Sequence, residues 1–475
     1  MSEPAGTTED TVGEPAAATP PARGAAKPAV PPVTDRRQAV EDLETELRRT
    51  PRATRPFEHA ILSYRLGLAY AEAPPGGNPV QGYRKALACY EVASAIFDKD
   101  NDPVEHARVL NAAGAAHRAL GDSRRAARLF EQAADLLLER DRDDERAAML
   151  NNLGLARAEI GALDDAVSAC DAALELFDTT TAEGRRGWIA ALHTRGMAKA
   201  ARGTPDGLLA ALDDYQEAAA DIDIEEAPYH FALVHSSIGV TCSALAGQER
   251  DPDRRRRHLA EAVGAFTQAL AVFTRTDFPN QHAMTKYNLG LAMVATDEGD
   301  DLRRALSYFE DAAAAFDRHT QGAAWNQAFT SMTRVEEELG RRLPGTSRTQ
   351  HYAALVADAD EREARGLLRD RVPRLLEHPD NIRRAAFVDL AAAVTQLDFE
   401  SARLFTARML EVLMELPQEH MGMVLAATLD AHRRLPPEQL DDAARFLDQA
   451  VSDALVGPQR IWVRDYLYSM GFERP

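Results

Sequence analysis

The chain has 475 residues, of which 45% are apolar and 27% charged, an ordinary balance for a globular protein. Its 75 acidic and 55 basic residues give a formal net charge of −20, so the chain as a whole repels a phosphate backbone and we expect no nucleic-acid binding. Only 6% of the residues are aromatic, which favours close-packed helices over a β-sandwich or barrel. We therefore expect an all-α fold.

The first segment, residues 1–33, is rich in alanine and proline. Such a segment buries too little apolar surface to offset its ordering entropy, so we expect a disordered tail. It has no apolar stretch typical of a secretory signal, and no run in the chain approaches the roughly 18 apolar residues that span a bilayer. The three cysteines form no C-x-x-C pair. We therefore expect a cytoplasmic protein without membrane contact.

A first helix is predicted from about Thr34 to just before Pro51, and from Phe57 on the sequence repeats. Six times an alanine is followed four residues later by an aromatic residue or cysteine, and three residues further by another alanine. This spacing puts all three side chains on one helical stripe. The sets are Ala86/Tyr90/Ala93, Ala126/Phe130/Ala133, Ala166/Cys170/Ala173, Ala211/Tyr215/Ala218, Ala262/Phe266/Ala269 and Ala305/Phe309/Ala312.

An earlier helix precedes each set and carries a glycine at a matching place. A glycine in one helix and alanines in the next let two backbones approach closely, while the aromatic ring fills the remaining space. Four of the six intervals between glycine and alanine are longer than the others, which predicts insertions in the turns between helices. The six glycines are Gly67, Gly114, Gly154, Gly196, Gly239 and Gly290.

This pattern of glycine, alanine and aromatic residues resembles the tetratricopeptide repeat and covers roughly residues 57–315. The glycines lie 40 to 51 residues apart, more than the usual 34, and the usual repeat-ending proline is missing. The longer repeat and the phrase Leu150–Gly154 are similar to the kinesin-light-chain-like subclass, which is common in bacterial signalling proteins. The resemblance implies an α-solenoid of about six helix pairs that binds proteins.

A helix over about Ala323–Arg341, with Trp325, Phe329, Met332 and Val335 on one stripe, is predicted to cap the array. The repeat domain is thus predicted over residues 34–345. Residues 346–475 lack the repeat pattern and are predicted to form a separate C-terminal domain of five or six helices. Both a bundle and a HEAT-like continuation fit this part, and one helix break is expected at Val372–Pro373.

No spacing of residues points to catalysis, a metal or a cofactor. The sequence has no H-E-x-x-H motif, no phosphate-binding glycine loop and no paired cysteines, and we expect no enzyme activity. The charge runs Arg254–Arg257 and Asp141–Glu145 are predicted to be solvated loops between helices. Cys89, Cys170 and Cys242 are expected to be small buried apolar residues rather than reactive thiols.

The resemblance places the binding groove on the concave side of the array, along the first helix of each pair. Residues just before each glycine would line it, and asparagine amides could pair with the backbone of an extended peptide. The alternative is that these amides bond neighbouring helices. The predicted groove residues are Tyr64, Arg65, Arg108, Asn111, Asn151, Asn152, His193, Ser237, Tyr287 and Asn288.

The sequence therefore predicts a scaffold or adaptor that holds a peptide or protein partner in this groove. A second hypothesis is a peptide-responsive regulator that controls a DNA-binding or effector partner. A basic recognition helix would favour that second hypothesis, and the sequence offers none.

Overall fold

The computed structural model describes residues 33–74, 77–296 and 299–472, and all regular secondary structure in these ranges is helical. The chain forms two compact units, one up to Leu120 and one from Gly121 onwards. The predicted tail lies outside the described residues, apart from Val33.

In the first unit each helix packs against the next one along the chain. Its first helix confirms the prediction for residues 34 to 50, and Val40 lies buried on its inner face. The four helices are α1 (Val33–Arg49), α2 (Pro56–Glu72), α3 (Pro79–Ser94) and α4 (Pro103–Ala119).

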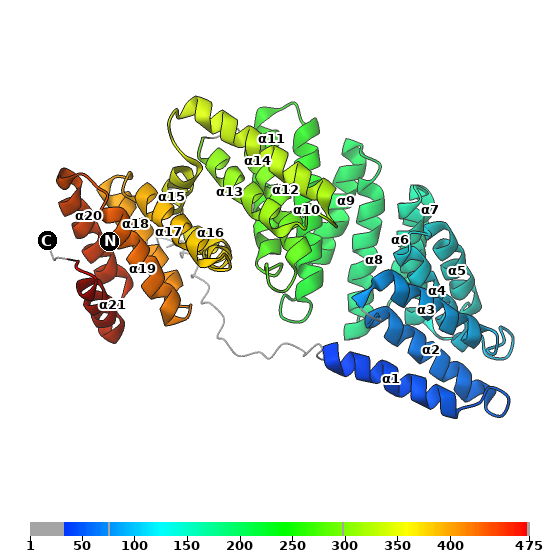
Figure 1. Ribbon diagram of the computed structural model, residues 1–475. Coiled ribbons are helices and arrows are strands. Elements are labelled where there is room, and N and C mark those ends of the chain that lie inside the picture. Colours follow the sequence, from blue (N-terminus) through cyan, green and yellow to red (C-terminus); the bar gives the residue numbers. More distant parts are fainter. Residues whose placement is uncertain (1–32, 75–76, 297–298, 473–475) are drawn as a thin grey trace, which may run out of the picture. The chain divides into compact units, whose positions relative to one another are not determined.

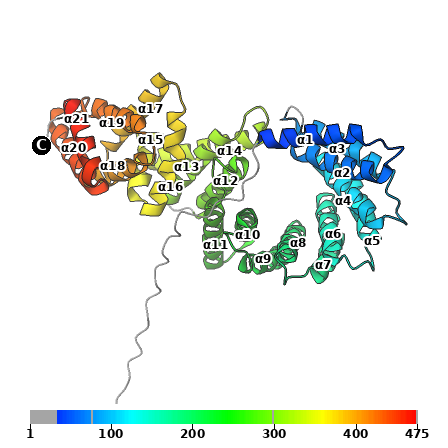
Figure 2. The same ribbon diagram turned by 90° about the horizontal axis from the view of Figure 1, so that it is seen from below.

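The second unit opens with the remaining repeats. Figure 1 shows α8 to α13 following one another as helical hairpins, and Figure 2 shows α6, α8 and α10 in one layer with α7, α9 and α11 in another. The helices are α5 (Ser123–Leu136), α6 (Asp143–Glu159), α7 (Leu163–Leu176), α8 (Ala182–Ala200), α9 (Pro205–Ala220), α10 (Pro228–Gln248), α11 (Pro252–Leu270), α12 (Pro279–Thr296), α13 (Gly299–Ala315) and α14 (Gly322–Arg342).

The sequence sets the ends of these helices in two ways. Proline stands in the first turn of α9, α10 and α11, where it lacks only an N–H that would have no partner within the helix. Gly161 and Gly203, each seven residues after a repeat glycine, have φ values of +80° and +68°. Glycine adopts this left-handed conformation without the steric cost of a Cβ atom, so it ends α6 and α8.

The predicted contact between paired helices is confirmed for five pairs, α2/α3, α6/α7, α8/α9, α10/α11 and α12/α13. All twelve alanines of the six sets are completely buried. A Cβ atom built on Gly67, Gly196, Gly239 or Gly290 would lie 2.4 to 2.7 Å from a ring carbon of the paired Tyr or Phe. On Gly154 it would lie 2.5 Å from the Sγ atom of Cys170. Glycine is thus required because the ring or the sulfur atom occupies the place of a side chain.

The prediction that the long interval after Gly239 is an inserted turn is wrong. The extra residues lengthen the helices themselves, so α10 has 21 residues and α11 has 19. Arg254–Arg257 consequently form an exposed part of α11 instead of a loop, because Asp251 caps the helix and Pro252 starts it. Likewise, Asp143–Glu145 form the first turn of α6, where acidic side chains suit the helix dipole.

Helix α14 lies where the capping helix was predicted. Met332 and Val335 are buried as expected, whereas Phe329 is 44% exposed and stacks on Trp325 at a ring distance of 5.0 Å. Of the four residues predicted to share one buried face of this helix, only Met332 and Val335 are buried.

The C-terminal residues form seven helices within the described ranges, more than the predicted five or six. Pro373 does not break the chain but lies inside α16. The helices are α15 (Arg348–Asp358), α16 (Glu361–Leu376), α17 (Asp380–Val394), α18 (Phe399–Leu413), α19 (Gln418–His432), α20 (Pro437–Ala454) and α21 (Gly457–Ser469).

These helices form a second repeat that the sequence analysis missed. Helices α16, α18 and α20 begin 38 residues apart, as do α17 and α19. Helix α17 packs mainly on α19 and α18 on α20, so alternate helices stack in two rows. Ion pairs tie these rows, including Arg369–Glu415 at 2.6 Å and Arg384–Asp430 at 2.5 Å. This stacking is that of a continuing α-solenoid rather than a closed bundle.

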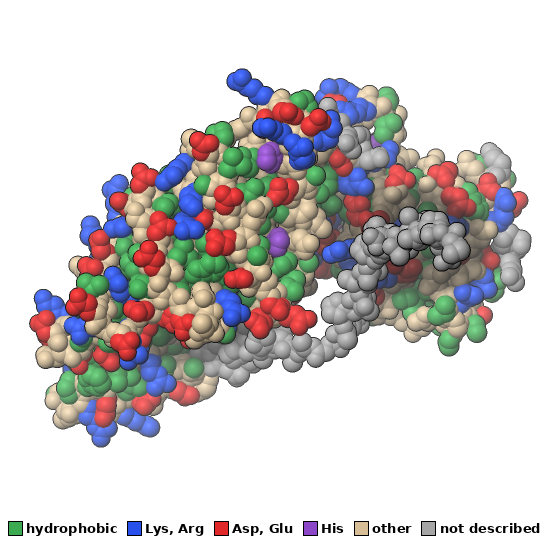
Figure 3. All heavy atoms as spheres, turned by 180° about the vertical axis from the view of Figure 1, so that it is seen from behind, with side chains coloured by type: hydrophobic (Ala, Val, Ile, Leu, Met, Phe, Trp, Pro, Cys, Tyr) green, Lys and Arg blue, Asp and Glu red, His purple; other side chains and the backbone are tan. Residues whose placement is uncertain are grey.

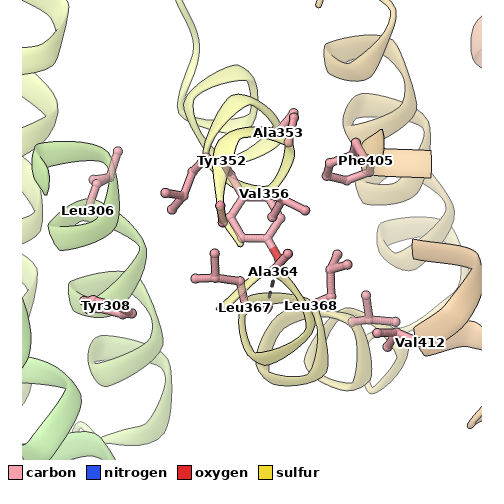
Figure 4. Close-up of a cluster of buried hydrophobic side chains, with 14 of the residues drawn as sticks. Leu306, Tyr308, Tyr352, Ala353, Val356, Ala364, Leu367, Leu368, Phe405 and Val412 are labelled. Carbon is pink, nitrogen blue, oxygen red and sulfur yellow. Dashed lines mark hydrogen bonds between the residues drawn. The ribbon is translucent and has the colours of Figure 1, made fainter. Parts of the chain in front are cut away.

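An apolar core joins α13 of the repeats to the C-terminal helices. Figure 4 shows Leu306 and Tyr308 of α13 facing side chains of α15 and α16, with Phe405 of α18 on the far side. The buried hydroxyl group of Tyr352 donates a hydrogen bond of 3.0 Å to the carbonyl oxygen of Leu367. The buried cluster runs from Ile189 to Leu467. The predicted domain boundary after residue 345 stays a prediction.

Candidate functional site

The first helix of each pair has one face that its partner helix does not cover. The repeat glycine points at the partner helix, and each residue turns the helix by about 100°. Around the helix axis, the residue directly after the glycine therefore lies about 100° from it, and the residue six positions before it lies about 120° from it in the same direction. These positions are where exposed side chains are expected.

In the second unit four of these positions carry exposed large apolar side chains. Met197, Val240 and Leu291 each directly follow a repeat glycine and are 39%, 48% and 42% exposed. Met284, six residues before Gly290, is also exposed. Helices α8, α10 and α12 contact one another in sequence, so these side chains belong to one row of helices. We call Met197, Val240, Met284 and Leu291 the apolar stripe.

The predicted groove residues include no member of the apolar stripe, because most of them stand two or three residues before a glycine. The signal was present, since a Leu, Met or Val follows five of the six glycines. On α2 of the first unit, Ile61 and Leu68 occupy the same two positions and are also exposed.

The predicted groove residues of the second unit lie on α6, α8, α10 and α12, and they differ in exposure. Asn151 and Asn152 are half-buried on α6, and Tyr287 and Asn288 are half-buried on α12. The Tyr287 ring lies 5.6 Å from that of Phe309, so this side chain also supports the pair α12 and α13. The Oδ1 atom of Asn151 is shielded from solvent and accepts no hydrogen bond from the described residues.

His193 and Ser237 connect two neighbouring repeats. His193 on α8 is buried, and its Nε2 atom lies 2.9 Å from the Oγ atom of Ser237 on α10. The His193 ring also packs 5.6 Å from the Tyr215 ring. Burial lowers the pKa of His193 to about 4, and the charge of His230 acts in the same direction. The imidazole is therefore neutral at physiological pH and has a partner within the fold.

The predicted groove residues of the first unit lie on α2 and α4. Arg65 is exposed, while Tyr64, Arg108 and Asn111 are half-buried. The Tyr64 ring lies 6.1 Å from the ring of Tyr90, a member of the first alanine set. Their place in a binding groove stays a prediction.

Charges of both signs are mixed over the protein surface. Figure 3 shows Lys and Arg side chains interspersed with Asp and Glu over the face that it draws, with hydrophobic side chains between them.

The described residues contain no group of three or more His, Cys, Asp or Glu side chains that could hold a metal ion. Cys170 and Cys242 are buried and Cys89 is half-buried. Burial raises the pKa of Cys170 and Cys242 to about 12 and that of Cys89 to about 11. All three thiols stay protonated near neutral pH, which makes them poor nucleophiles.

The helix pairs, the buried alanine sets and the glycine contacts together define a tetratricopeptide-type α-solenoid. No family model and no curated protein matches the chain. Among solved structures, BtubC (BKLC) from P. vanneervenii is 14% identical over 56% of this chain and 93% of its own, with a TM-score of 0.35. Yeast Tom70 is 11% identical over 87% of this chain and 96% of its own, with a TM-score of 0.21. The architecture assigned to this chain rests on its own helix pairing.

In the described part of the chain, no helix combines the length and the apolar character needed to cross a membrane.

Proposed function

We propose that the chain is an interaction scaffold that holds a peptide or protein partner against the uncovered face of the first helices of its repeats. The observation that carries this proposal is the apolar stripe, which exposes four large apolar side chains on three contacting helices. Soluble proteins rarely leave such side chains uncovered in neighbouring positions unless a partner covers them. The partner would bury Met197, Val240, Met284 and Leu291.

Polar groups beside the apolar stripe would orient the partner. Asn151 and Asn152 on α6 and Asn288 on α12 are half-buried amides on the same row of helices. An amide offers a donor and an acceptor and can bond both groups of an extended backbone.

Site-specific cross-linking tests the proposal and identifies the partner. A photoreactive amino acid at Val240 on α10 would sit in the apolar stripe. Leu209 on α9, which is 47% exposed against 48% for Val240, provides a matched control on a second helix. We expect the Val240 probe to capture one predominant protein in the source cells and the Leu209 probe to capture none of it. Equal capture at the two positions would contradict the proposal.

A further inference from the structure

A polar cavity lies where the last repeat meets the C-terminal helices. Its volume is about 240 Å³, and it lies between α12, α13, α16 and the segment before α12. This volume accommodates several water molecules or a small organic molecule. The ionisable residues that line it are Arg275, His282, Asp311, Asp370, Arg374 and Glu377.

Buried ion pairs hold the charges of the cavity wall. Lys286 on α12 is 5% exposed, and its Nζ atom lies 2.6 Å from Asp370 Oδ2 and 3.5 Å from Asp311 Oδ2. Arg374 on α16 approaches Asp311 Oδ1 at 2.9 Å. Lys286 lies beside the cavity, and with Arg374 and Arg275 it balances the three carboxylates of Asp311, Asp370 and Glu377. The wall therefore carries charges of both signs, which suits a ligand that also carries both signs.

His282 and Asp370 present two acceptors to each other without a donor between them. The Nδ1 atom of His282 lies 2.8 Å from the carbonyl oxygen of Phe273, which only accepts, so Nδ1 carries the hydrogen. In the neutral ring Nε2 is therefore an acceptor. It lies 3.9 Å from Asp370 Oδ1, too far for a hydrogen bond. Burial lowers the pKa of His282, against the opposing charge of Asp370, which favours the neutral ring.

The rim of the cavity carries a guanidinium group already paired with a carboxylate. The Nη2 atom of Arg275 donates to both carboxylate oxygens of Glu377 at 2.6 Å, whereas its Nη1 atom has no hydrogen-bond partner among the described residues. The Glu377 side chain is 64% exposed and can move into solvent. A ligand carboxylate could then take its place on Arg275 in the two-pronged geometry that guanidinium groups favour.

From this geometry we infer that the cavity binds a small zwitterion with a primary ammonium group and a carboxylate, the chemical class of free α-amino acids. The ammonium group donates to His282 Nε2 and Asp370 Oδ1, which supplies the missing donor. The carboxylate pairs with Arg275 at the rim. This site goes beyond the proposed scaffold function and shares no residue with the apolar stripe.

Calorimetric titration of the full chain with each of the common free amino acids tests this inference. We expect at least one to bind with a Kd of about 1 mM or tighter. Simple alkylamines and alkyl carboxylates of similar size, which carry only one of the two groups, should bind at least about ten-fold more weakly. No binding by any amino acid, or equal binding by the single-group compounds, would overturn the inference.

Two rim variants locate the site. Arg275→Gln removes the guanidinium group and should weaken amino-acid binding about ten-fold or more. Glu377→Gln is the matched control, because it removes the competing carboxylate from the same ion pair and should leave binding unchanged or tighter. Both side chains are partly exposed, and circular dichroism checks that both variants fold. Unchanged binding by Arg275→Gln would show that the ligand sits elsewhere and would refute this site.

Discussion

Alanine at Gly239 would place a methyl group in steric overlap with the ring of Phe266. The built Cβ atom lies 2.6 Å from Phe266 Cε1, 2.7 Å from Cδ1 and 2.8 Å from Cζ, all well below van der Waals contact. The Phe266 ring is completely buried and cannot swing into solvent. Such overpacking costs about 1–3 kcal/mol, whereas the better helix propensity of alanine returns up to about 1 kcal/mol. We therefore expect Gly239→Ala to be destabilising by roughly 1 kcal/mol.

Gly264, on the paired helix α11, is the matched control. It is exposed, and a Cβ atom built on it meets nothing within 4 Å. Gly264→Ala should therefore gain the helix propensity alone and stabilise the protein by up to about 1 kcal/mol. Because both variants gain the same propensity, the difference between them isolates the overpacking cost of about 1–3 kcal/mol.

Urea unfolding followed by circular dichroism measures this difference. The midpoint should fall for Gly239→Ala and rise for Gly264→Ala. Equal midpoints for the two variants would show that Gly239 does not face Phe266, and the reasoning about helix pairing would fail.

Three further predictions concern other residues of the repeats and of the C-terminal helices. Ala166, completely buried in α7, should tolerate no larger side chain, so Ala166→Leu should cost about 1–3 kcal/mol in urea unfolding, and a cost under about 0.5 kcal/mol would refute the repeat register. Burial lowers the pKa of His432 to about 4, so the unfolded chain binds a proton that the folded chain does not, and stability should fall as the pH drops from about 6.5 to about 4. His432→Phe should reduce this pH-dependent loss of unfolding free energy by up to about 3 kcal/mol. An unchanged pH profile of the urea midpoint would exclude His432 as its cause. Replacing Asn151 and Asn152 with Ala should weaken partner binding roughly ten-fold with helix content intact, whereas unchanged affinity with lower stability would mean that the amides are structural.

The repeat region could be predicted in detail because its packing contacts are local. Ala262 and Phe266 lie four residues apart, and each set follows its glycine by a short interval. The periodicity alone therefore indicates which side chains of the two paired helices contact each other. The C-terminal repeat lacks the alanine pattern, and its 38-residue period appears only in weak signals such as the spacing from Pro379 to Pro417. The helix break predicted at Pro373 is wrong, since α16 accommodates this proline.

The sites were harder to predict than the fold. The predicted groove residues lie on the first helices of the pairs, but the direction in which His193 faces depends on Ser237 in the next repeat. Lys286 and Asp370 meet across two helices far apart in sequence, and no spacing rule joins them. Burial of such charges depends on tertiary packing, which the sequence pattern does not reveal.

The central claim is that the partner binds over the apolar stripe. Titration of the captured partner against Val240→Asp and Leu209→Asp tests it most directly, because the two positions are equally exposed and differ in the helix that carries them. Burying a valine contributes about 1.5–3 kcal/mol, so Val240→Asp should weaken binding by at least about ten-fold. Leu209→Asp should leave the affinity unchanged. Equal affinities for the two variants would contradict the account.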